Sequence, residues 1–419
     1  MRILYTIFGL WLAHAAHAAE LPADIDLPIA YQKEALGNSL RCLDTIKGDD
    51  YRIALTRIWV SENLAYLGDE DAAVKVLRAS APHYVIPYGC VESALTLLAH
   101  GQNRAVRQLL ELAIDLLPFT ASVGGEEVQL QAIKIATVLE EPDLVALAQR
   151  KLPVSPAIFD VQQQAFLQDW KPNLWNRLLD RIWPERQWAD LKKGANRAEQ
   201  IAWNQGRVAD AFTALLFIKE AEARVRRGER YPGHWIEFAR TGVRATTPNT
   251  RPVAIQAELA ALAGLEGKKA ESVALSKSAF GMMQGWAPQM TGLYPVTRDL
   301  AVRLAAEGIA GEDRDFFLAR VSERVKLLRS QLDPYEQMLQ LPPLAEALHA
   351  LGAADQAREA WKAATDLCAK NQNPEGQSIG LTRIWMSYAR ANAWPAKETE
   401  VLLAKIEKKL PEGYAKVNF

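Results

Sequence analysis

Carboxylates and tryptophans gather in one stretch of the chain, and an enzyme that acts on polysaccharides uses these residue types. Two carboxylates on opposite sides of a glycosidic bond serve as acid and base, and tryptophan rings stack on sugar rings. The alternative is that the rings fill a helical core, where each buries a large apolar area. We favour the core and assign no catalytic residue. The acids are Asp169, Asp180, Glu185 and Asp190, and the tryptophans are Trp170, Trp175, Trp183, Trp188 and Trp203.

The local motifs of several enzyme classes are missing from the sequence. It contains no phosphate-binding glycine loop, no dinucleotide-binding fingerprint and no His-Glu-x-x-His pair, and we expect no hydrolase-type nucleophile elbow. No two of the histidines beyond residue 18 are four residues apart, which excludes a helical metal-binding pair. We therefore predict no metal site and no cofactor, and we lean towards a protein that is not an enzyme. These histidines are His83, His100, His234 and His349.

The chain begins with the pattern of a secretory signal peptide. Met1-Arg2 gives a positive start, residues 3–12 are mostly apolar, and Ala16-His17-Ala18 offers a small-x-small cleavage site. The apolar stretch is too short to span a bilayer, and an uncleaved anchor is the alternative. We predict a signal peptide over residues 1–18, no membrane span in the mature chain, and an exported protein that is periplasmic in a Gram-negative cell or secreted.

The composition excludes some partners. With 49% hydrophobic and 24% charged residues, the chain of 419 residues can bury a large core. Its formal net charge of −1 gives no long-range attraction to nucleic acid or to anionic lipid. The densest basic run, residues 224–230, lies close to Glu220 and Glu222. We interpret it as a solvated helix end, with an anionic ligand as the alternative.

The three cysteines leave two interpretations open. Cys42 and Cys90 lie in the first helical segments and can pair in an oxidising compartment. Alternatively, these two and Cys368 are buried free thiols. Their spacing fits no zinc site.

A turn glycine recurs after segments of helical periodicity, and it is the strongest structural signal in the sequence. Gly68, Gly101, Gly206 and Gly352 are each followed at +5 and +9 by apolar residues. Glycine adopts the left-handed conformation that ends a helix, and a small residue at +5 lets a second helix pack closely. The pattern predicts an all-α fold of antiparallel helix pairs. The apolar residues are Ala73 and Leu77, Val106 and Leu110, Ala211 and Leu215, and Ala357 and Trp361.

Two of these segments resemble the tetratricopeptide repeat family. Gly101 to Pro118 places a small residue, a large apolar residue, an alanine and a terminal proline at the positions of that repeat, and Leu344 to Thr365 is similar to a nearly complete one. The resemblance covers part of the chain, and the distances between turns are not multiples of one repeat length. It implies a divergent TPR-like protein, a right-handed α-solenoid of TPR-like helical hairpins.

The resemblance also implies where a partner binds. In that family, the first helix of each hairpin lines a concave groove, and residues six, three and two before the turn glycine face the ligand. Polar and aromatic residues at these positions suit an extended peptide. Before Gly101 the corresponding Leu95 and Leu98 are apolar, and we expect another helix to cover them. The predicted partner-binding residues are Glu62, Tyr66, Gln200, Trp203, Asn204, Glu346 and His349.

A second internal similarity joins the two ends of the chain. Residues 55–61, Leu-Thr-Arg-Ile-Trp-Val-Ser, reappear at 381–387 as Leu-Thr-Arg-Ile-Trp-Met-Ser. Either the similarity arises by chance, or both segments descend from one repeat and place Arg and Trp in equivalent positions.

These observations predict a signal peptide over residues 1–18, helical repeats over 19–152, a Trp-rich helical segment over 153–247 and further repeats over 248–419. We expect an exported, non-catalytic scaffold that binds a peptide, a protein or a cell-envelope component in its groove. The alternative is a secreted glycoside hydrolase or lyase built as a closed helical toroid. A toroid would bring Trp59 and Trp385 together, whereas an open solenoid keeps them apart.

Overall fold

Helices form almost all of the part of the chain that the structure describes. This computed structural model describes residues 27–46, 51–80, 82–119, 125–151, 211–243, 250–284 and 292–410. Over these ranges there are seventeen α-helices, one 3₁₀ turn and no strand, which confirms the all-α prediction. The predicted signal peptide and the tryptophan-rich stretch up to Trp203 lie outside the described residues.

The chain divides into two compact units, and the division does not follow the sequence order. The first unit joins residues 1–46 to residues 283–419, and the second consists of residues 47–282. In this division the first described helix belongs with the C-terminal helices. The first unit contains α2 (Leu27–Asp44), α16 (Leu293–Ala306), α17 (Gly311–Gln331), α18 (Pro334–Ala350), α19 (Ala354–Lys370), α20 (Pro374–Ala391) and α21 (Lys397–Glu407).

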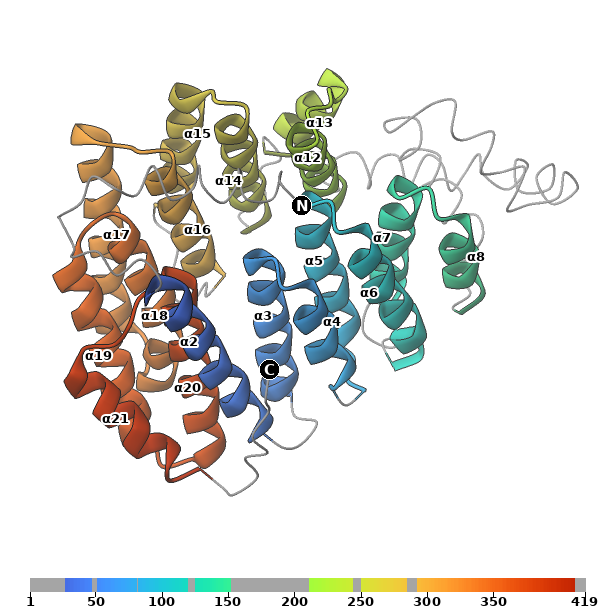
Figure 1. Ribbon diagram of the computed structural model, residues 1–419. Helices are drawn as coiled ribbons and strands as arrows, with labels where there is room; N and C mark the ends of the chain where they lie inside the picture. The colour runs from blue at the N-terminus through green and yellow to red at the C-terminus, as the bar shows by residue number, and fades with distance from the viewer. Residues whose placement is uncertain are drawn as a thin grey trace, which may run out of the picture. The chain divides into compact units, whose positions relative to one another are not determined.

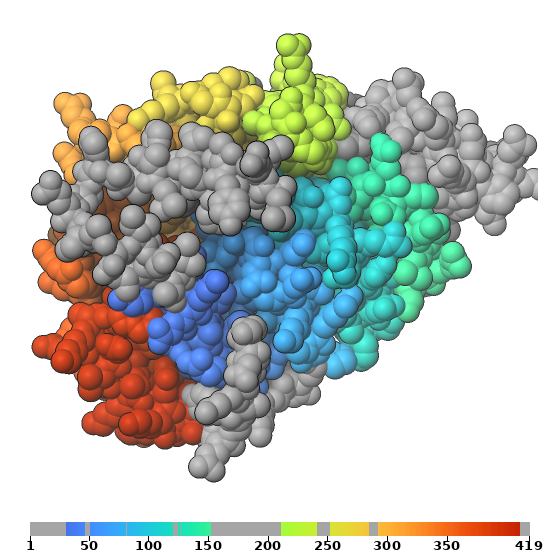
Figure 2. Space-filling model, in the orientation of Figure 1, coloured from blue at the N-terminus to red at the C-terminus, as the bar shows by residue number. Residues whose placement is uncertain are grey.

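The second unit is a series of helical hairpins. Within it, the first helix of a hairpin packs on the first helix of the next, as α3 does on α5 and α12 on α14, and second helices pair in the same way, as α4 does with α6 (Figure 1). On the face drawn in Figure 2, the surface of α3 to α8 runs from blue through cyan to green in chain order. The helices of this unit are α3 (Tyr51–Leu67), α4 (Glu70–Arg78), α5 (Ile86–Ala99), α6 (Asn103–Leu116), α7 (Gly125–Val138), α8 (Pro142–Lys151), α12 (Ala211–Arg226), α13 (Gly233–Val243), α14 (Thr250–Leu265) and α15 (Lys269–Met282), and the 3₁₀ turn is η1 (Leu117–Phe119).

In the first unit, α2 completes the packing of the last hairpin. The helices α16, α18 and α20 stack in that order, and α2 lies along α20. The hydroxyl of Ser39 donates to the carbonyl of Thr382 at 2.8 Å, and the Tyr31 ring stacks on Trp394 with 5.1 Å between centroids. Two segments more than 300 residues apart in the sequence therefore form one packed face.

One turn geometry joins the helices of every described hairpin. At Gly68, Gly101 and Gly352 the backbone has positive φ, and the next residue donates to a carbonyl five residues back, as the Asp69 N–H does to Leu64 at 2.9 Å. These three turns are confirmed, and Gly206 lies outside the described residues. Ala211 and Leu215 fall on α12, which pairs with α13 across Gly228. The same turn occurs at Glu140, Gly228, Gly267, Gly308 and Asn392.

The repeated seven-residue motif does not occupy equivalent places. In both copies the tryptophan and the serine are buried, and the threonine hydroxyl donates to the carbonyl four residues before it at 2.8 Å. However, Ser61 lies seven residues before its turn residue Gly68, whereas Ser387 lies five before Asn392. Two residues rotate a helix by about 200°, so the two copies face different directions relative to their turns. The geometry does not support the interpretation that they hold Arg and Trp in equivalent positions.

Close approach of neighbouring helices depends on glycine at two positions. A Cβ atom at Gly89 on α5 would lie 2.7 Å from Cγ2 of Ile58 on α3, and one at Gly380 on α20 would lie 2.6 Å from the sulfur of Met338 on α18. Both distances are below normal contact distances, so the Ile58 and Met338 side chains reach the neighbouring helix backbone only because these two residues lack side chains.

We expect Gly89→Ala to lower the free energy of unfolding by about 1–3 kcal/mol, because the added methyl group must push α3 and α5 apart. Chemical denaturation followed by circular dichroism measures the change. Gly233→Ala is the matched control, since a Cβ there meets nothing within 4 Å. Equal stability of the two variants would contradict this account of the helix contact.

Candidate functional site

The residues predicted to bind a partner lie in different environments. On α3, the side chain of Glu62 is partly exposed and Tyr66 keeps 40% of its surface accessible. On α18, Glu346 is 1% exposed, and His349 packs its ring near Trp361 with 5.7 Å between centroids. Gln200, Trp203 and Asn204 lie outside the described residues. The helices α3 and α18 belong to different units.

The position six residues before the turn is generally inside the protein. It is buried in six of the eight described hairpins. The predicted covering of α5 is confirmed, because Leu95 and Leu98 are buried and α5 packs against α12. This helix face therefore mainly contacts neighbouring helices. The buried residues are Leu95, Lys134, Glu222, Ala261, Glu346 and Met386, and the partly exposed ones are Glu62 and Val302.

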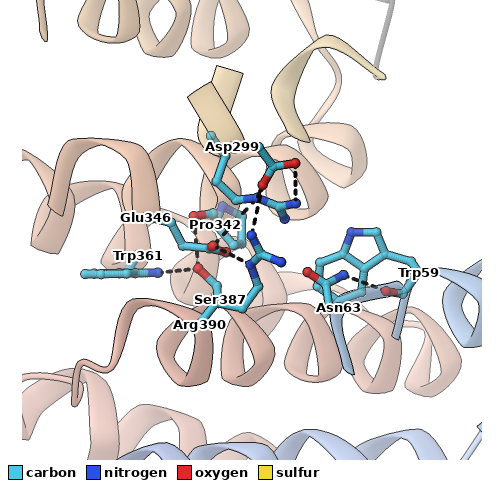
Figure 3. Close-up of polar contacts among 9 residues, drawn as sticks. Trp59, Asn63, Asp299, Pro342, Glu346, Trp361, Ser387 and Arg390 are labelled. Atoms are coloured by element: carbon cyan, nitrogen blue, oxygen red, sulfur yellow. Dashed lines mark hydrogen bonds and ion pairs between the residues drawn. The ribbon is translucent and has the colours of Figure 1, made fainter. Parts of the chain in front are cut away.

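An ion-pair network joins three first helices of the first unit (Figure 3), and it is buried at Arg390 and Glu346 while Asp299 keeps 40% of its side chain exposed. The guanidinium of Arg390 on α20 donates through Nε to Glu346 Oε2 on α18 and through Nη2 to Asp299 Oδ1 on α16, both at 2.9 Å. Arg298 adds a hydrogen bond from Nε to Asp299 Oδ1 at 2.8 Å. The side chains of Arg390 and Glu346 are 2% and 1% exposed. Glu346 is thus engaged inside this unit and does not lie on a surface that a partner could reach.

Hydroxyl and indole groups extend this network into α19. Trp361 Nε1 donates to Ser387 Oγ at 2.8 Å, and the Ser387 hydroxyl donates to the carbonyl of Pro342 at 2.9 Å. Trp361 also stacks on Tyr388 with 4.6 Å between centroids. These contacts fix the relative positions of α18, α19 and α20.

The two carboxylates of the network have opposite pKa shifts. Burial raises the pKa of Glu346, and the nearby Arg298 and Arg390 offset this only in part. For Asp299, burial acts in the same direction, but Arg298 and Arg390 outweigh it and lower the pKa. Carboxylates with divergent pKa values are typical of acid and base pairs. Here, however, one is inaccessible and both are held by arginines, so we interpret the network as a structural clamp.

A second charged cluster lies in the second unit, between α12 and α14. Lys219 Nζ lies 3.3 Å from Glu222 Oε1 and also pairs with Glu258 on α14. Glu222 is 4% exposed, and its burial raises its pKa to about 7 although Lys219 opposes the shift. At the end of α5, burial and then the charges of Arg226 and Lys219 lower the pKa of His100 to about 4. The packing of α12 against α14 is therefore coupled to the protonation of the Glu222 carboxyl group.

The basic run after residue 223 forms a helix end, as predicted. The helix α12 ends at Arg226. Arg224 Nε donates to Glu220 at 2.9 Å, and Arg227 pairs with Glu229 at the same distance. Two of its four arginines, Arg224 and Arg227, are therefore paired with neighbouring glutamates.

One segment of the sequence matches the hydrolase nucleophile motif. Residues 376–380 read Gly-Gln-Ser-Ile-Gly, which fits Gly-x-Ser-x-Gly. A nucleophile elbow requires a sharp turn between a strand and a helix, whereas these residues lie within α20. The central Ser378 is 2% exposed, and its hydroxyl hydrogen-bonds to that of Thr45 at 2.8 Å. The expectation of no elbow therefore holds for this segment.

The described residues also show the state of the cysteines, the arrangement of possible metal ligands and the length and apolarity of the helices. Cys42, Cys90 and Cys368 are buried free thiols. Within the described ranges, no group of His, Cys, Asp and Glu is arranged to hold a metal ion. No described helix is long and apolar enough to cross a membrane.

Comparison with protein-family models, with curated proteins and with solved structures gives no significant match to this chain.

Arg390→Met is expected to lower the free energy of unfolding by about 3–5 kcal/mol, because Glu346 then stays buried without its main partner. Combining it with Glu346→Met should recover part of the loss, since the buried carboxylate that lost its partner is then removed as well. Urea denaturation measures both effects. The control is Arg358→Met, whose exposed pair with Asp355 contributes about 0–1 kcal/mol. Equal losses in Arg390→Met and the control would refute the clamp.

The second cluster predicts a pH effect on stability. Because the pKa of Glu222 is raised in the folded protein, the folded state holds more protons than the unfolded chain between the ordinary glutamate pKa and about 7. Its contribution to stability is therefore present at low pH and is lost as the pH rises through this window. In Glu222→Gln this contribution disappears.

Between about pH 5 and pH 8, we expect the parent to lose roughly 1–3 kcal/mol more unfolding free energy than Glu222→Gln does. Urea titrations at the two pH values test this. His100 contributes to the pH dependence of stability in the opposite direction, and comparing the variant with the parent cancels most of that contribution. The control is Glu312→Gln, at an exposed glutamate. The same pH dependence in the parent and in Glu222→Gln would exclude this role for the carboxyl group.

Proposed function

We propose that this chain is an exported, non-catalytic helical-repeat scaffold that binds a peptide, a protein or a cell-envelope component through the inner face of α3. The observation that carries the proposal is a concentration of exposed apolar side chains. Of the six large apolar residues exposed in the described part of the chain, three lie on α3, namely Tyr51, Leu55 and Tyr66. The other three lie on three separate elements.

The exposed residues of α3 form one stripe, which we call the α3 stripe and define as Tyr51, Leu55, Glu62 and Tyr66. At about 100° per residue these four positions fall within an arc of about 60°. The exposed fractions of the three apolar members are 47%, 36% and 40%. Clustered exposed apolar residues mark contact surfaces more often than scattered ones, so the α3 stripe is the best-supported binding surface.

The packing of the second unit accounts for this exposure. On α5, the inner positions Leu95 and Leu98 are buried, and α12 packs against that helix. Glu62 is the residue of α3 that corresponds to Leu95 relative to the turn, and it remains partly exposed. Within the second unit, the inner position of α3 is thus more exposed than that of α5.

The finer features of the proposal have separate support. A right-handed TPR-like superhelix is supported by the turn shared by all described hairpins, by the packing of first helices on first helices, and by the resemblance around Gly101 and Gly352. Export, to the periplasm or to the medium, is supported by the signal-peptide pattern of residues 1–18.

The test places a photo-crosslinking amino acid at Leu55 or Tyr66 in the full-length protein, expressed in its native cell. We expect both positions to capture a partner, and we expect Tyr66→Ala to reduce capture at position 55 by about tenfold, as loss of an aromatic anchor does. Helicity by circular dichroism should stay unchanged. The control position is Val401 on α21, which is 62% exposed but far from α3 in the sequence. If positions 55 and 66 capture no more than position 401, the α3 stripe is not the binding surface.

A further inference from the structure

We propose that a small cavity of the second unit binds a free α-amino acid with a branched aliphatic side chain. The cavity has a volume of about 40 Å³ and lies where α13, α14 and α15 meet (Figure 1). Three of its features support this ligand: an apolar floor of limited size, a rim with two positive and two negative groups, and one ion pair of that rim with open hydrogen-bonding positions.

One repeated spacing builds the cavity. On each of the three helical segments, an apolar and a charged lining residue are four residues apart, which places both on one side of the helix. Each segment therefore supplies an apolar group to the floor and a charged group to the rim. The pairs are Ile236 and Arg240 on α13, Leu262 and Glu266 at the end of α14, and Leu275 and Glu271 on α15.

The floor of the cavity is apolar and small. Leu259, Leu262 and Ala263 are 3%, 2% and 4% exposed. A water molecule needs about 10–15 Å³ of such a volume, so the cavity of about 40 Å³ has room for about three waters or a similar number of carbon atoms. A cavity that holds benzene measures about 150 Å³. The floor therefore fits a branched aliphatic group and excludes an aromatic ring.

The charges of the rim balance one another. Arg240 and Lys268 are positive, and Glu266 and Glu271 are negative. A ligand with one charge of each sign is complementary to this rim, whereas a ligand with a single charge is repelled by two of the four groups. The rim therefore favours a zwitterion.

One ion pair of the rim has no free carboxylate oxygen. Glu266 accepts from the Tyr231 phenol through Oε1 at 2.8 Å and from Lys268 Nζ through Oε2 at 3.0 Å. Burial and the hydrogen bond to Glu266 raise the pKa of Tyr231, so the phenol stays protonated and keeps donating. Both oxygens of Glu266 are thus engaged within the protein.

The other ion pair keeps positions that a ligand can use. Arg240 donates through Nη2 to Glu271 Oε1 at 2.9 Å, and the two side chains are 53% and 39% exposed. Among the described residues, Arg240 Nε and Nη1 and Glu271 Oε2 have no hydrogen-bond partner.

An α-amino acid carries its carboxylate, its ammonium group and its side chain on one carbon atom. Its carboxylate can accept from Arg240 and its ammonium group can donate to Glu271, both as charge-assisted hydrogen bonds. The side chain then enters the apolar floor between them. Such a combination of an apolar pocket and a few polar groups at its mouth is typical of small-molecule sites.

Isothermal titration calorimetry on the full-length protein tests the inference with four probes. L-leucine carries both charges and a branched side chain, and L-phenylalanine replaces that side chain by an aromatic one. Isocaproate is leucine without its ammonium group, and isoamylamine is leucine without its carboxylate. We expect L-leucine to bind at least about tenfold more tightly than each of the other three, because each lacks one charge-assisted hydrogen bond or does not fit the floor.

Two variants assign the charged groups of the ligand to their partners. Arg240→Gln should weaken binding of L-leucine by about tenfold without weakening that of isoamylamine, and Glu271→Gln should do so without weakening that of isocaproate. Both residues are exposed, so these changes leave the fold intact. Arg358→Gln is the matched control, because Arg358 is an exposed arginine paired with an acid on α19, and it should leave leucine binding unchanged.

Equal binding of all four probes, or no binding of L-leucine at millimolar concentration, would overturn the inference. An equal loss for all probes in Arg240→Gln would also overturn it, since the ion pair would then only shape the cavity. The crosslinking test of the α3 stripe concerns a different helix, so these results and the proposed function can fail independently.

Discussion

One guanidinium constrains the first unit more than any other group. Arg390 on α20 holds carboxylates from α18 and α16, so the inner faces of three successive first helices must stay within hydrogen-bond reach. Such a network tolerates little separation of the helices, because a buried charge that loses its partner is far more costly than the pair is stabilising. Arg390 and Glu346 therefore fill part of the inner side of these hairpins, whereas Asp299 keeps 40% of its side chain exposed.

Much of the fold was predictable, because it follows from local rules. A glycine with positive φ after a helical segment identifies a hairpin turn, and Gly68, Gly101 and Gly352 confirmed this. The turns at Glu140 and Asn392 were not predicted, since neither residue is a glycine and both have positive φ in the structure. Conversely, the letters Gly-x-Ser-x-Gly occur where no elbow exists, because a motif acquires its chemistry only from the surrounding backbone.

The candidate surface was predictable only in part. Glu62 and Glu346 occupy the same position relative to their turns, yet one is partly exposed and the other is 1% exposed. The local sequence does not predict this difference in exposure, because it depends on whether another helix packs against that face. Tyr66 was identified from its place before the turn, whereas Tyr51 and Leu55 were not, because their role follows from the shared exposure of one helix face.

The pairing of α2 with α20 makes the order of synthesis matter. Ser39 leaves the ribosome long before Thr382, to which it is hydrogen-bonded across 343 positions of sequence. Until then, the apolar side of α2 has no partner within its own unit and is available to chaperones or to other chains. Closing so long a loop slows folding far more than it weakens the folded state. A nascent chain that stops short of α20 would thus lack a complete first unit, however well its earlier hairpins had formed.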